Sequence, residues 1–330
     1  MGRGSQSEAI VRALLSEGGI RYSEGHSCKG LVIFPLFLPE AAPARDYVLF
    51  ADDLRAGDVL VEEVAGGVVS RLVVSNRGDR AVLLVDGEQL VGVKQNRTVN
   101  TTILVAARTR LEIPVACVEQ GRWGPGRVAL VPADTLYPAA RMAAAEAVTE
   151  AVRTRGVHEA DQARLWASIA SKLRDVGVSS RTSAAYDAYL QRASDLEAYV
   201  RALPPAPGQC GVACALNGQV VCLDLFDHPE TLHALYPRLI RSYALDALLA
   251  WDAPTHPAEL DRFLAEARTG RATVHPAVGE GEEVRLTSPQ VVGAALVAGG
   301  RAVHLALFRR PAVVYSDTGL APSQRRRRIS

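Results

Sequence analysis

The sequence predicts an α+β fold with a strand-rich N-terminal part, a helical middle segment and a C-terminal part of hairpins and helices. Between about residues 30 and 130, short runs of Val, Ile and Leu alternate with polar residues and are separated by turn formers. Between about 134 and 203, apolar residues recur at helical spacing instead. Because many short strands follow one another in the first part, we expect a β-sandwich or an open barrel there.

The middle segment is predicted to hold three helices. Asp134 is the expected N-cap of the first helix, because it precedes an alanine-rich run. Apolar residues at helical spacing between 165 and 176 predict the second helix, and Gly177 is its expected end. The third helix is expected between about 179 and 203.

The C-terminal part contains two similar hairpin sequences. GVACALNGQVVCLDLF (211–226) and GAALVAGGRAVHLALF (293–308) align without gaps, and seven of their sixteen positions are identical. The dipeptides Asn217-Gly218 and Gly299-Gly300 supply the positive φ that two-residue hairpin turns require. We therefore expect two hairpins that share one sheet or face each other.

One difference between the two hairpins points to chemistry. Asp224 in the first corresponds to Ala306 in the second. If both strands pack in the same way, packing does not require this carboxylate. Asp224 is therefore a candidate catalytic residue.

A helix is predicted directly after the first hairpin, in DHPETLHALYPRLIRSYALDALL. Asp227 and Glu230 have the spacing of a capping box, so they are expected to start the helix rather than to act in catalysis. Arg238 and Arg241 lie off the apolar stripe and are expected to be exposed helix charges.

These patterns divide the chain into five predicted segments, with the proline-rich PPAPG at 204–208 as a linker. They are an N-terminal extension (1–29), a β-rich domain (30–130), a helical segment with the linker (131–208), an α+β segment (209–317) and a disordered basic tail (318–330).

Charge and hydropathy exclude several classes of function. The net charge is +1, and the tail alone carries the four arginines 325–328, so the rest of the chain has no basic field for duplex nucleic acid. The longest apolar stretch is interrupted by Arg301 and His304, which argues against a membrane span. The N-terminus lacks a signal-peptide core. We expect a cytoplasmic protein that binds neither membranes nor duplex nucleic acid.

The cysteines favour buried, reduced thiols over disulfides or a zinc site. There are five of them, an odd number, mostly within apolar strand patterns. Cys210 and Cys214 have a spacing that invites zinc, but no second Cys or His pair lies nearby. We expect no zinc to be held by Cys210, Cys214 and Cys222, and no metal site elsewhere.

A polar stretch, DGEQLVGVKQNRTVNTT (86–102), interrupts the strands of the β-rich part. TVNTTILV and LEIPVACV, joined by AARTR, predict a hairpin that brings KQNR (94–97) beside EQGRW (119–123). Their mixture of cations, amides, carboxylate and aromatic ring suits an anionic, ring-bearing small molecule. The predicted ligand-binding residues are Asp86, Glu88, Lys94, Gln95, Asn96, Arg97, Glu119, Gln120, Arg122 and Trp123, and the catalytic candidates are Glu88, Glu119 and Asp224.

The position of the first two acidic residues depends on one turn. If Asp86-Gly87 is a tight turn, EQLVGV is a return strand and Glu88 lies at the opposite end of the sheet from Arg97. If 86–97 is one long loop, Asp86 and Glu88 join the cluster. We expect Arg97 and Glu119 close together at the wall of a pocket, with Glu88 and Trp123 within reach.

Three blocks of the sequence resemble a known prokaryotic family. DGEQLVGVKQNRTVNTT, IPVACVEQGRW and LDLFDHPETLHALYPRLIRSYALDAL are similar to the recurring blocks of the ADP-ribosylglycohydrolase- and rhodanese-phosphatase-associated protein domain, over roughly residues 30–310. Gln89 and Val93 depart from that family's pattern, and its charged positions are intact. The family's name implies an association with ADP-ribose or nucleotide metabolism rather than an activity.

Two functions remain open. In the first, an enzyme or sensor binds an ADP-ribose- or NAD-derived ligand: Lys94, Arg97 and Arg122 hold phosphate and Trp123 stacks a base. Glu88 or Glu119 then acts as general base or binds ribose. In the second, the protein is a non-catalytic module for a protein partner. The sequence contains no P-loop, nucleophile elbow or dinucleotide fingerprint, so it identifies neither an enzyme class nor a cofactor.

Overall fold

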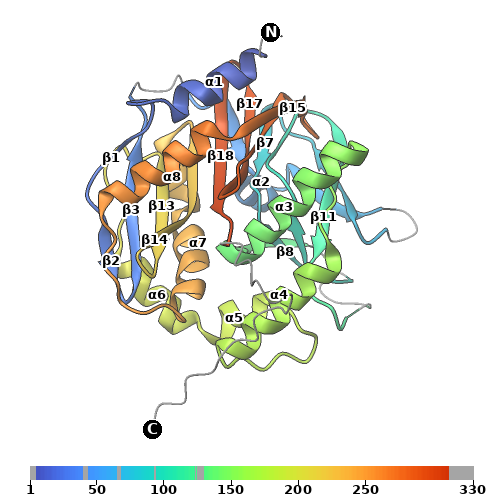
Figure 1. Cartoon of the computed structure of the whole chain (residues 1–330). Helices are drawn as coiled ribbons and strands as arrows, with labels where there is room; N and C mark the ends of the chain where they lie inside the picture. The colour runs from blue at the N-terminus through green and yellow to red at the C-terminus, as the bar shows by residue number, and fades with distance from the viewer. Residues whose placement is uncertain are drawn as a thin grey trace.

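A large antiparallel sheet dominates the computed structural model, which describes residues 5–39, 44–64, 68–92, 94–122, 124 and 130–311, without the side chains of residues 53 and 55 (Figure 1). Its strands are β1 (Arg21–Tyr22), β2 (His26–Cys28), β3 (Leu31–Phe37), β13 (Gly211–Leu216), β14 (Gln219–Phe226), β15 (Arg271–Pro276), β16 (Glu282–Thr287), β17 (Val291–Ala298) and β18 (Arg301–Arg309). Their order is β1-β3-β13-β14-β18-β17-β16-β15, and β2 also pairs with β3. The N-terminal strand β3 thus extends a sheet that is otherwise built mainly by the C-terminal third.

Two smaller sheets come from the N-terminal half. One contains β4 (Tyr47–Leu49), β7 (Ala81–Leu84) and β10 (Ile103–Val105), in the order β10-β7-β4. The other contains β5 (Val59–Glu63), β6 (Arg71–Asn76), β8 (Glu88–Val91), β9 (Arg97–Val99), β11 (Arg110–Cys117) and β12 (Val131–Thr135), in the order β12-β8-β9-β11-β6-β5. Both sheets contribute to one apolar cluster, in which Leu84 and Ile103 of the first join Leu72 and Val115 of the second. The expected α+β class with a strand-rich N-terminal part is confirmed.

The helices of the described residues pack on all three sheets, and some of them cover both faces of the large sheet. They are α1 (Gln6–Leu15), α2 (Phe50–Ala56), α3 (Pro138–Arg155), α4 (Gln162–Asp175), α5 (Ala185–Gln191), α6 (Ala193–Ala202), α7 (Pro229–Ala247) and α8 (Pro257–Thr269). Helices α1 and α8 pack on one face, while α3 and α7 pack on the other (Figure 1). The side chains of β14 alternate between the two faces. Leu223 and Leu225 join the core under α1 and α8, whereas Cys222 and Phe226 join the core under α3 and α7.

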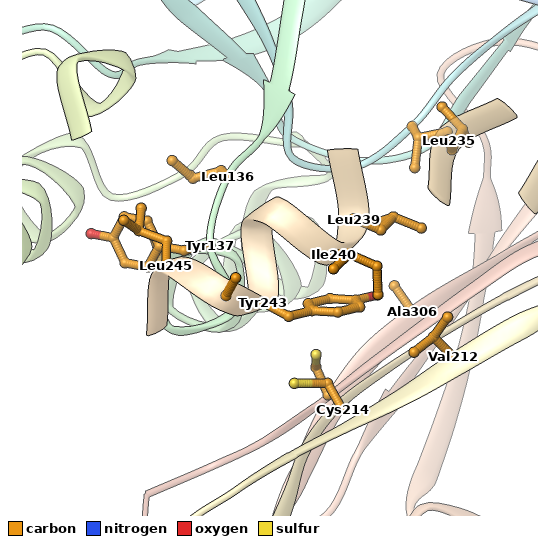
Figure 2. Packing of buried hydrophobic residues seen from close by; sticks show 14 of the residues in the cluster. Leu136, Tyr137, Val212, Cys214, Leu235, Leu239, Ile240, Tyr243, Leu245 and Ala306 are labelled. Atoms are coloured by element: carbon orange, nitrogen blue, oxygen red, sulfur yellow. The ribbon is translucent and has the colours of Figure 1, made fainter. Parts of the chain in front are cut away.

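The core under α7 explains the length of that helix. Leu235, Leu239 and Tyr243 of α7 point toward Val212 and Cys214 of the sheet (Figure 2). These side chains recur at helical spacing, so one stripe of α7 is buried along its whole length. Each fully buried residue of this size contributes about 1.5–3 kcal/mol through burial alone.

The two similar hairpins lie in one sheet. Strands β13 and β14 form the first, β17 and β18 form the second, and β14 pairs directly with β18. In this pairing Asp224 faces Ala306 across the two strands, and Phe226 faces His304. The expected arrangement of the two hairpins is confirmed. It places the one carboxylate that distinguishes them on the buried face toward α7.

Three expected helix boundaries are wrong. Asp134 lies in β12 rather than at a helix N-cap, and α3 begins only at Pro138. The third predicted helix is two helices, α5 and α6, which meet at Arg192. Asp227 does not cap α7: it accepts the Tyr47 hydroxyl at 2.5 Å and a guanidinium hydrogen of Arg301 at 2.7 Å. At Asp134 and Asp227, bonds to residues that are distant in the sequence replace the expected helix cap.

Candidate functional site

The chain passes from one small sheet to the other at a tight turn formed by Asp86 and Gly87. The Glu88 amide donates to the Val85 carbonyl at 3.0 Å, and β8 begins at Glu88. Gly87 has a φ of +80°, and a Cβ at this position would come within 2.7 Å of the Arg141 side chain. Any other residue would be strained here. Of the two sequence-based alternatives, the structure has the tight turn.

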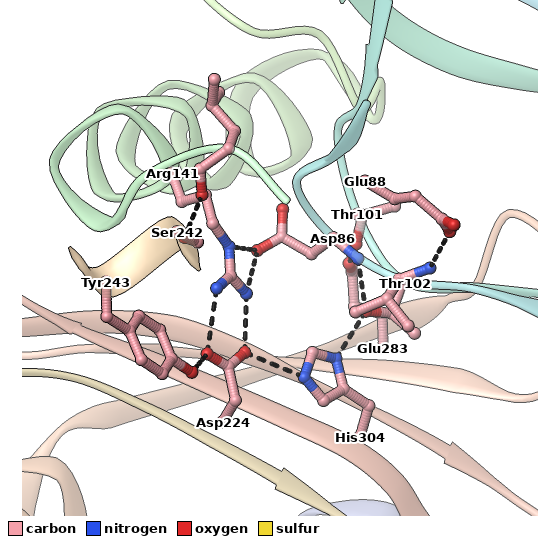
Figure 3. Close-up of polar contacts among 12 residues, drawn as sticks. Asp86, Glu88, Thr101, Thr102, Arg141, Asp224, Ser242, Tyr243, Glu283 and His304 are labelled. Atoms are coloured by element: carbon pink, nitrogen blue, oxygen red, sulfur yellow. Dashed lines mark hydrogen bonds and ion pairs between the residues drawn. The ribbon is translucent and has the colours of Figure 1, made fainter. Parts of the chain in front are cut away.

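Arg141 of α3 is the centre of a buried network beneath this turn (Figure 3). Its side chain is 0% exposed. Nη1 and Nη2 donate to the two carboxylate oxygens of Asp224 at 2.9 and 2.7 Å. Nε and Nη2 also donate to Oδ2 of Asp86 at 3.3 and 3.2 Å. One guanidinium thus joins the turn to strand β14, and two carboxylates supply the negative charge that a buried cation requires.

Tyr243 and His304 complete the hydrogen bonding around Asp224. The Tyr243 hydroxyl donates to Oδ2 at 2.6 Å, and His304 Nε2 lies 3.1 Å from Oδ1. On its other side, His304 Nδ1 lies 2.7 Å from the Thr102 hydroxyl, which accepts the Asp86 amide hydrogen at 3.1 Å. A ring that carries its proton on Nε2 satisfies both contacts, because an ionised carboxylate can only accept.

The two carboxylates of the network differ in their pKa. Burial alone would raise the pKa of Asp224, but the charge of Arg141 and the hydrogen bonds from His304 and Arg141 hold it below its ordinary value. Burial keeps the pKa of Asp86 raised, since the longer contacts with Arg141 only partly oppose it. Asp224 is therefore a fixed negative charge, and Asp86 is closer to protonation.

Glu88 is buried next to the same turn, with 2% of its surface exposed. Arg238 Nη1 donates to Oε1 at 3.3 Å, and the Val85 amide donates to Oε2 at 3.4 Å. Burial raises the pKa of Glu88 to about 7, and Arg238 only partly opposes this. A carboxylate with such a pKa can both accept and donate a proton near neutral pH. The interpretation of Arg238 as a purely exposed charge is therefore wrong.

A second buried cluster surrounds Glu283 of β16. Arg285 donates to both of its carboxylate oxygens, at 2.7 and 3.0 Å, and His158 Nε2 donates to Oε2 at 2.7 Å. The Thr101 hydroxyl donates to Oε1. Burial would raise the pKa of Glu283, but these partners lower it to about 2. Glu283 therefore stays ionised throughout the physiological pH range.

A small polar cavity of about 20 Å³ lies between the two clusters. Its walls are formed by Asp86, Asn100, Thr101, Thr102, Ala145, Glu283, Arg285, Ala294, Leu296, Ala306 and Phe308. Asn100 is 4% exposed, and its Nδ2 donates to the His158 carbonyl at 3.0 Å. Its Oδ1 has no hydrogen-bond partner among the described residues. The cavity has room for about one water-sized group, and an unmet acceptor lies at its wall.

The KQNR and EQGRW segments meet, as the predicted hairpin requires. The Asn96 amide donates to Glu119 Oε2 at 3.0 Å, and Arg122 donates to the same carboxylate at 2.9 and 2.6 Å and to Asn96 Oδ1 at 3.1 Å. Burial opposes these partners, but together with a Thr182 hydrogen bond they hold the pKa of Glu119 below its ordinary value. The polar groups of Asn96, Glu119 and Arg122 therefore bond mainly to one another.

Arg97 points to a different place from Asn96. It is 0% exposed, its Nη1 donates to Gln95 Oε1 at 3.1 Å, and its Nη2 lies 3.9 Å from Glu63. Gln95 Oε1 also accepts from the Cys117 thiol at 2.9 Å. Only β9 forms the expected hairpin with β11, because β10 pairs with β7. Neither Arg97 nor Glu119 forms part of the wall of the polar cavity.

Comparison with known protein families identifies the chain. The model of the ARG and Rhodanese-Phosphatase-superfamily-associated Protein domain matches residues 19–308. The chain belongs to this family. The match runs from β1 to all but the last residue of β18 and therefore includes both buried clusters and the turn at Gly87. Neither the curated proteins nor the solved structures give a significant match.

The remaining predicted residues of this family member are spread over the same end of the sheet. Lys94 is half-buried in the loop between β8 and β9, and Gln120 is exposed. Trp123 and the tail 318–330 lie outside the described residues. The tight turn at Gly87 separates Asp86 and Glu88 from this loop, so the predicted ligand-binding residues within the described ranges form two groups rather than one.

Two further features of this family member concern metals and membranes. Cys214 and Cys222 face each other across the first hairpin, while Cys210 packs in the core on the other face of the sheet. Among the described residues, no group of three or more His, Cys, Asp or Glu is arranged to hold a metal ion. Within the same ranges, no helix has the length and apolar character needed to cross a membrane.

Sequence reasoning found Asp86, Glu88 and Asp224 but missed their partners. Arg141 lies in an alanine-rich helix, where an arginine is ordinarily exposed. The alignment of the two hairpins could have drawn attention to His304, which occupies the position of Cys222 in the second copy. Glu283 and Arg285 gave no signal, because alternating charges on a strand are typical of an exposed face.

Proposed function

We propose that this protein binds a hydroxyl-bearing ligand related to ADP-ribose or another nucleotide at the polar cavity beneath the Asp86–Thr102 segment. The observation that carries the proposal is the buried Asn100 Oδ1, which has no hydrogen-bond partner among the described residues and lies in a cavity wall otherwise well supplied with donors and acceptors. A buried acceptor without a partner costs roughly 1–3 kcal/mol. A ligand hydroxyl, or the water it replaces, would remove that cost.

The chemistry of the walls favours a sugar-like end of the ligand. Asp86 and Glu283 offer carboxylate acceptors, Thr101 and Thr102 offer hydroxyls, and Arg285 offers donors. Such a mixture matches a single hydroxyl of a ribose, which both donates and accepts and is about the size of the space. The family's association with ARG and rhodanese-phosphatase proteins supports a ligand of this class, although by analogy only.

Glu88 supports an enzymatic form of the proposal. Its carboxyl group is adjacent to Asp86 along the chain and has a pKa of about 7 because of its burial. General acids and bases work best when their pKa lies near the operating pH. In this form Glu88 exchanges a proton next to the turn, and Asp86, which lines the cavity and is held by Arg141, accepts from the ligand's hydroxyl.

The KQNR–EQGRW junction is the alternative position for the same ligand. There, Lys94, Arg97 and Arg122 would hold phosphate, Glu119 would bind ribose and Trp123 would stack on a base. The two positions differ in the substitution that should weaken ligand binding. Asn100 belongs to the cavity, and Arg97 belongs to the junction.

A ligand panel tests the proposal. NAD, ADP-ribose, ADP and ribose 5-phosphate are added to the purified protein, and the melting temperature and the ligand composition are measured. A bound ligand at about 100 times its Kd stabilises by roughly 2.7 kcal/mol. We expect Asn100→Ala to weaken binding by roughly tenfold, or 1.4 kcal/mol, and Glu88→Gln to abolish turnover while binding remains.

The controls decide the position of the site. Arg153→Ala removes an exposed helix charge that pairs only with the equally exposed Glu150, so it should leave binding unchanged. Loss of binding in Arg97→Ala and Glu119→Gln, with normal binding in Asn100→Ala, would place the ligand at the junction instead. If no compound of the panel shifts the melting temperature or is converted, the ligand-binding function is refuted.

A non-catalytic interaction module is the second candidate function, and one exposed residue favours it. Trp251 is 66% exposed and lines a surface cleft of about 1030 Å³ together with apolar residues such as Leu216 and Val221. Exposed aromatic rings beside a cleft are typical of protein-binding surfaces. A partner found by cross-linking should be lost in Trp251→Ser and retained in Leu190→Ser, a control whose side chain is 55% exposed.

A further inference from the structure

A second cavity has His158 in its wall, and His158 also bonds to two wall residues of the polar cavity, Asn100 and Glu283. The second cavity measures about 180 Å³, and its walls are formed by Ser70, Arg71, Glu112, Ile113, Pro114, Gly156, Val157, His158, Glu159 and Val278. We call it the vestibule. Four of its wall residues belong to the linker between α3 and α4, residues 156–161.

His158 of this linker contacts both cavities. Its ring and backbone line the vestibule. On the inner side, its carbonyl accepts from Asn100 Nδ2 at 3.0 Å, and its Nε2 donates to Glu283 Oε2 at 2.7 Å. Asn100 and Glu283 are both walls of the polar cavity. His158 therefore lies between the two cavities. One hydrogen bond to its backbone carbonyl and one from its ring hold it in place.

The linker can move without unfolding its neighbours. Gly156, with a φ of +67°, ends α3, and the Asp161 side chain caps α4. Both helices thus end or begin with their own caps, and His158 holds the linker to the walls of the polar cavity, while Glu159 pairs with Arg155 of α3. Short segments between capped helices are typical hinges, because their φ and ψ angles can change while both helices stay intact.

The chemistry of the two spaces is different. The polar cavity offers carboxylates, hydroxyls and an unmet amide oxygen. The vestibule offers the apolar side chains of Ile113, Pro114 and Val278 beside the paired charges of Arg71 and Glu112. The polar cavity therefore suits a hydroxyl group of a ligand, and the vestibule suits a flat, weakly polar ring of the same ligand.

We propose that the polar cavity and the vestibule are two chambers of one ligand site, with the 156–161 linker as the gate between them and His158 as its latch. One hydroxyl of the ligand enters the inner chamber, and the ring of the ligand occupies the vestibule. The identity of this ligand rests on the proposed function, but the gate itself does not. Opening requires the two His158 hydrogen bonds to break, and closing around the ligand restores them.

Labelling of a thiol in the inner chamber tests the gate without any ligand. Ala145 lines the polar cavity from α3 and is 7% exposed, so Ala145→Cys places a thiol there. The rate of its reaction with methyl methanethiosulfonate, followed by peptide mass spectrometry, reports opening. We expect the added change His158→Ala to accelerate labelling by roughly tenfold, which corresponds to the loss of about 1.4 kcal/mol of latch energy.

Arg153→Ala in the Ala145→Cys background is the matched control, since Arg153 lies on the same helix and is exposed. Its labelling rate should equal that of Ala145→Cys alone. Equal labelling rates with and without His158 would overturn the gate. So would an increase in the Arg153→Ala control as large as that in His158→Ala.

Hydrogen exchange of the unmodified protein gives an independent answer if a variant does not fold. The amides of Asn100 and of residues 157–159 should exchange through one common opening that is faster than the exchange of β17 in the central sheet. Exchange of these amides only at the rate of β17 would contradict the proposal. Because neither measurement uses a ligand, failure of the gate and failure of the ligand panel are distinguishable.

Discussion

Glu88 and Glu283 are equally buried, yet they have opposite pKa shifts. Glu88 is 2% exposed and Glu283 is 3% exposed. Glu283 accepts from Arg285, His158 and Thr101, and its pKa falls to about 2. Glu88 accepts from Arg238 at 3.3 Å and from one backbone amide, and its pKa rises to about 7.

The difference shows that the partners, rather than the depth, decide the charge of a buried carboxylate in this fold. Desolvation raises both pKa values, and only a set of close donors overcomes it. Glu283 has such a set and acts as a fixed charge. Glu88 lacks it and remains able to exchange a proton, which is what a general acid or base requires.

Removal of the main partner of Glu283 should have the largest effect. In Arg285→Met the carboxylate stays buried without its guanidinium, and breaking a buried pair in this way costs about 3–5 kcal/mol. We expect the free energy of unfolding, measured by urea denaturation at pH 7, to fall by that amount. Arg153→Met is the matched control, because its ion pair is exposed on both sides. A loss below about 1 kcal/mol would mean that Arg285 does not hold Glu283 in its charged form.

The pH dependence of stability should separate the two glutamates. The pKa of Glu88 is about 7 in the folded protein and near 4.5 when unfolded, so the folded state binds more protons between these values. Stability from Glu88 is therefore lost as the pH rises from about 4.5 to 7. We expect the difference in unfolding free energy between wild type and Glu88→Gln to fall by roughly 2–3 kcal/mol from pH 5 to pH 8.

Glu283→Gln provides the contrast for that measurement. Both the folded pKa of Glu283, about 2, and its unfolded value of 4.5 lie below pH 5. Its stabilisation is present above the unfolded value and is lost only as the pH falls toward 2. The difference between wild type and Glu283→Gln should therefore be constant from pH 5 to pH 8. A slope for Glu283→Gln like that of Glu88→Gln would refute the comparison.

The smallest expected effect concerns Arg238, the cation that pairs with Glu88. Arg238 lowers the pKa of Glu88 against the effect of burial, so Arg238→Gln should raise that pKa by about one unit. Carbon-13 NMR of the glutamate carboxyl groups measures the titration directly. Arg241→Gln is the control, because Arg241 pairs with Asp134 and Glu197 instead. An unchanged Glu88 titration in Arg238→Gln would show that the 3.3 Å contact is electrostatically unimportant.

Much of the fold could be predicted because its signals are local. Alternation in the strands and the glycine turns of the two hairpins need only neighbouring residues, and Gly177, with a φ of +67°, follows the end of α4 as expected. The helix starts failed where a distant partner replaced the local one. Asp227, for example, bonds to Tyr47 and Arg301 rather than to the first turn of α7.

The candidate site was predictable only in part, for the same reason. Asp224 could be found because the second hairpin has alanine at its position, and this comparison needs no structure. Arg141 could not, since its burial depends on β14 and on the turn at Gly87, which lie far from it in sequence. A single sequence shows which polar and charged side chains each segment carries. Which segments lie beside one another depends on the tertiary structure.

Strand β3 has a consequence for the synthesis of this chain. Its residues 31–37 pair with β13, and Leu36 lies opposite Gly211. At typical translation rates that partner leaves the ribosome roughly 10–35 s later. During this interval LVIFPLF, buried along nearly its whole length in the folded protein, has an unpaired edge in the nascent chain. Until β13 emerges, this apolar edge is open to pairing with other chains, so misassociation during synthesis is expected to begin at β3.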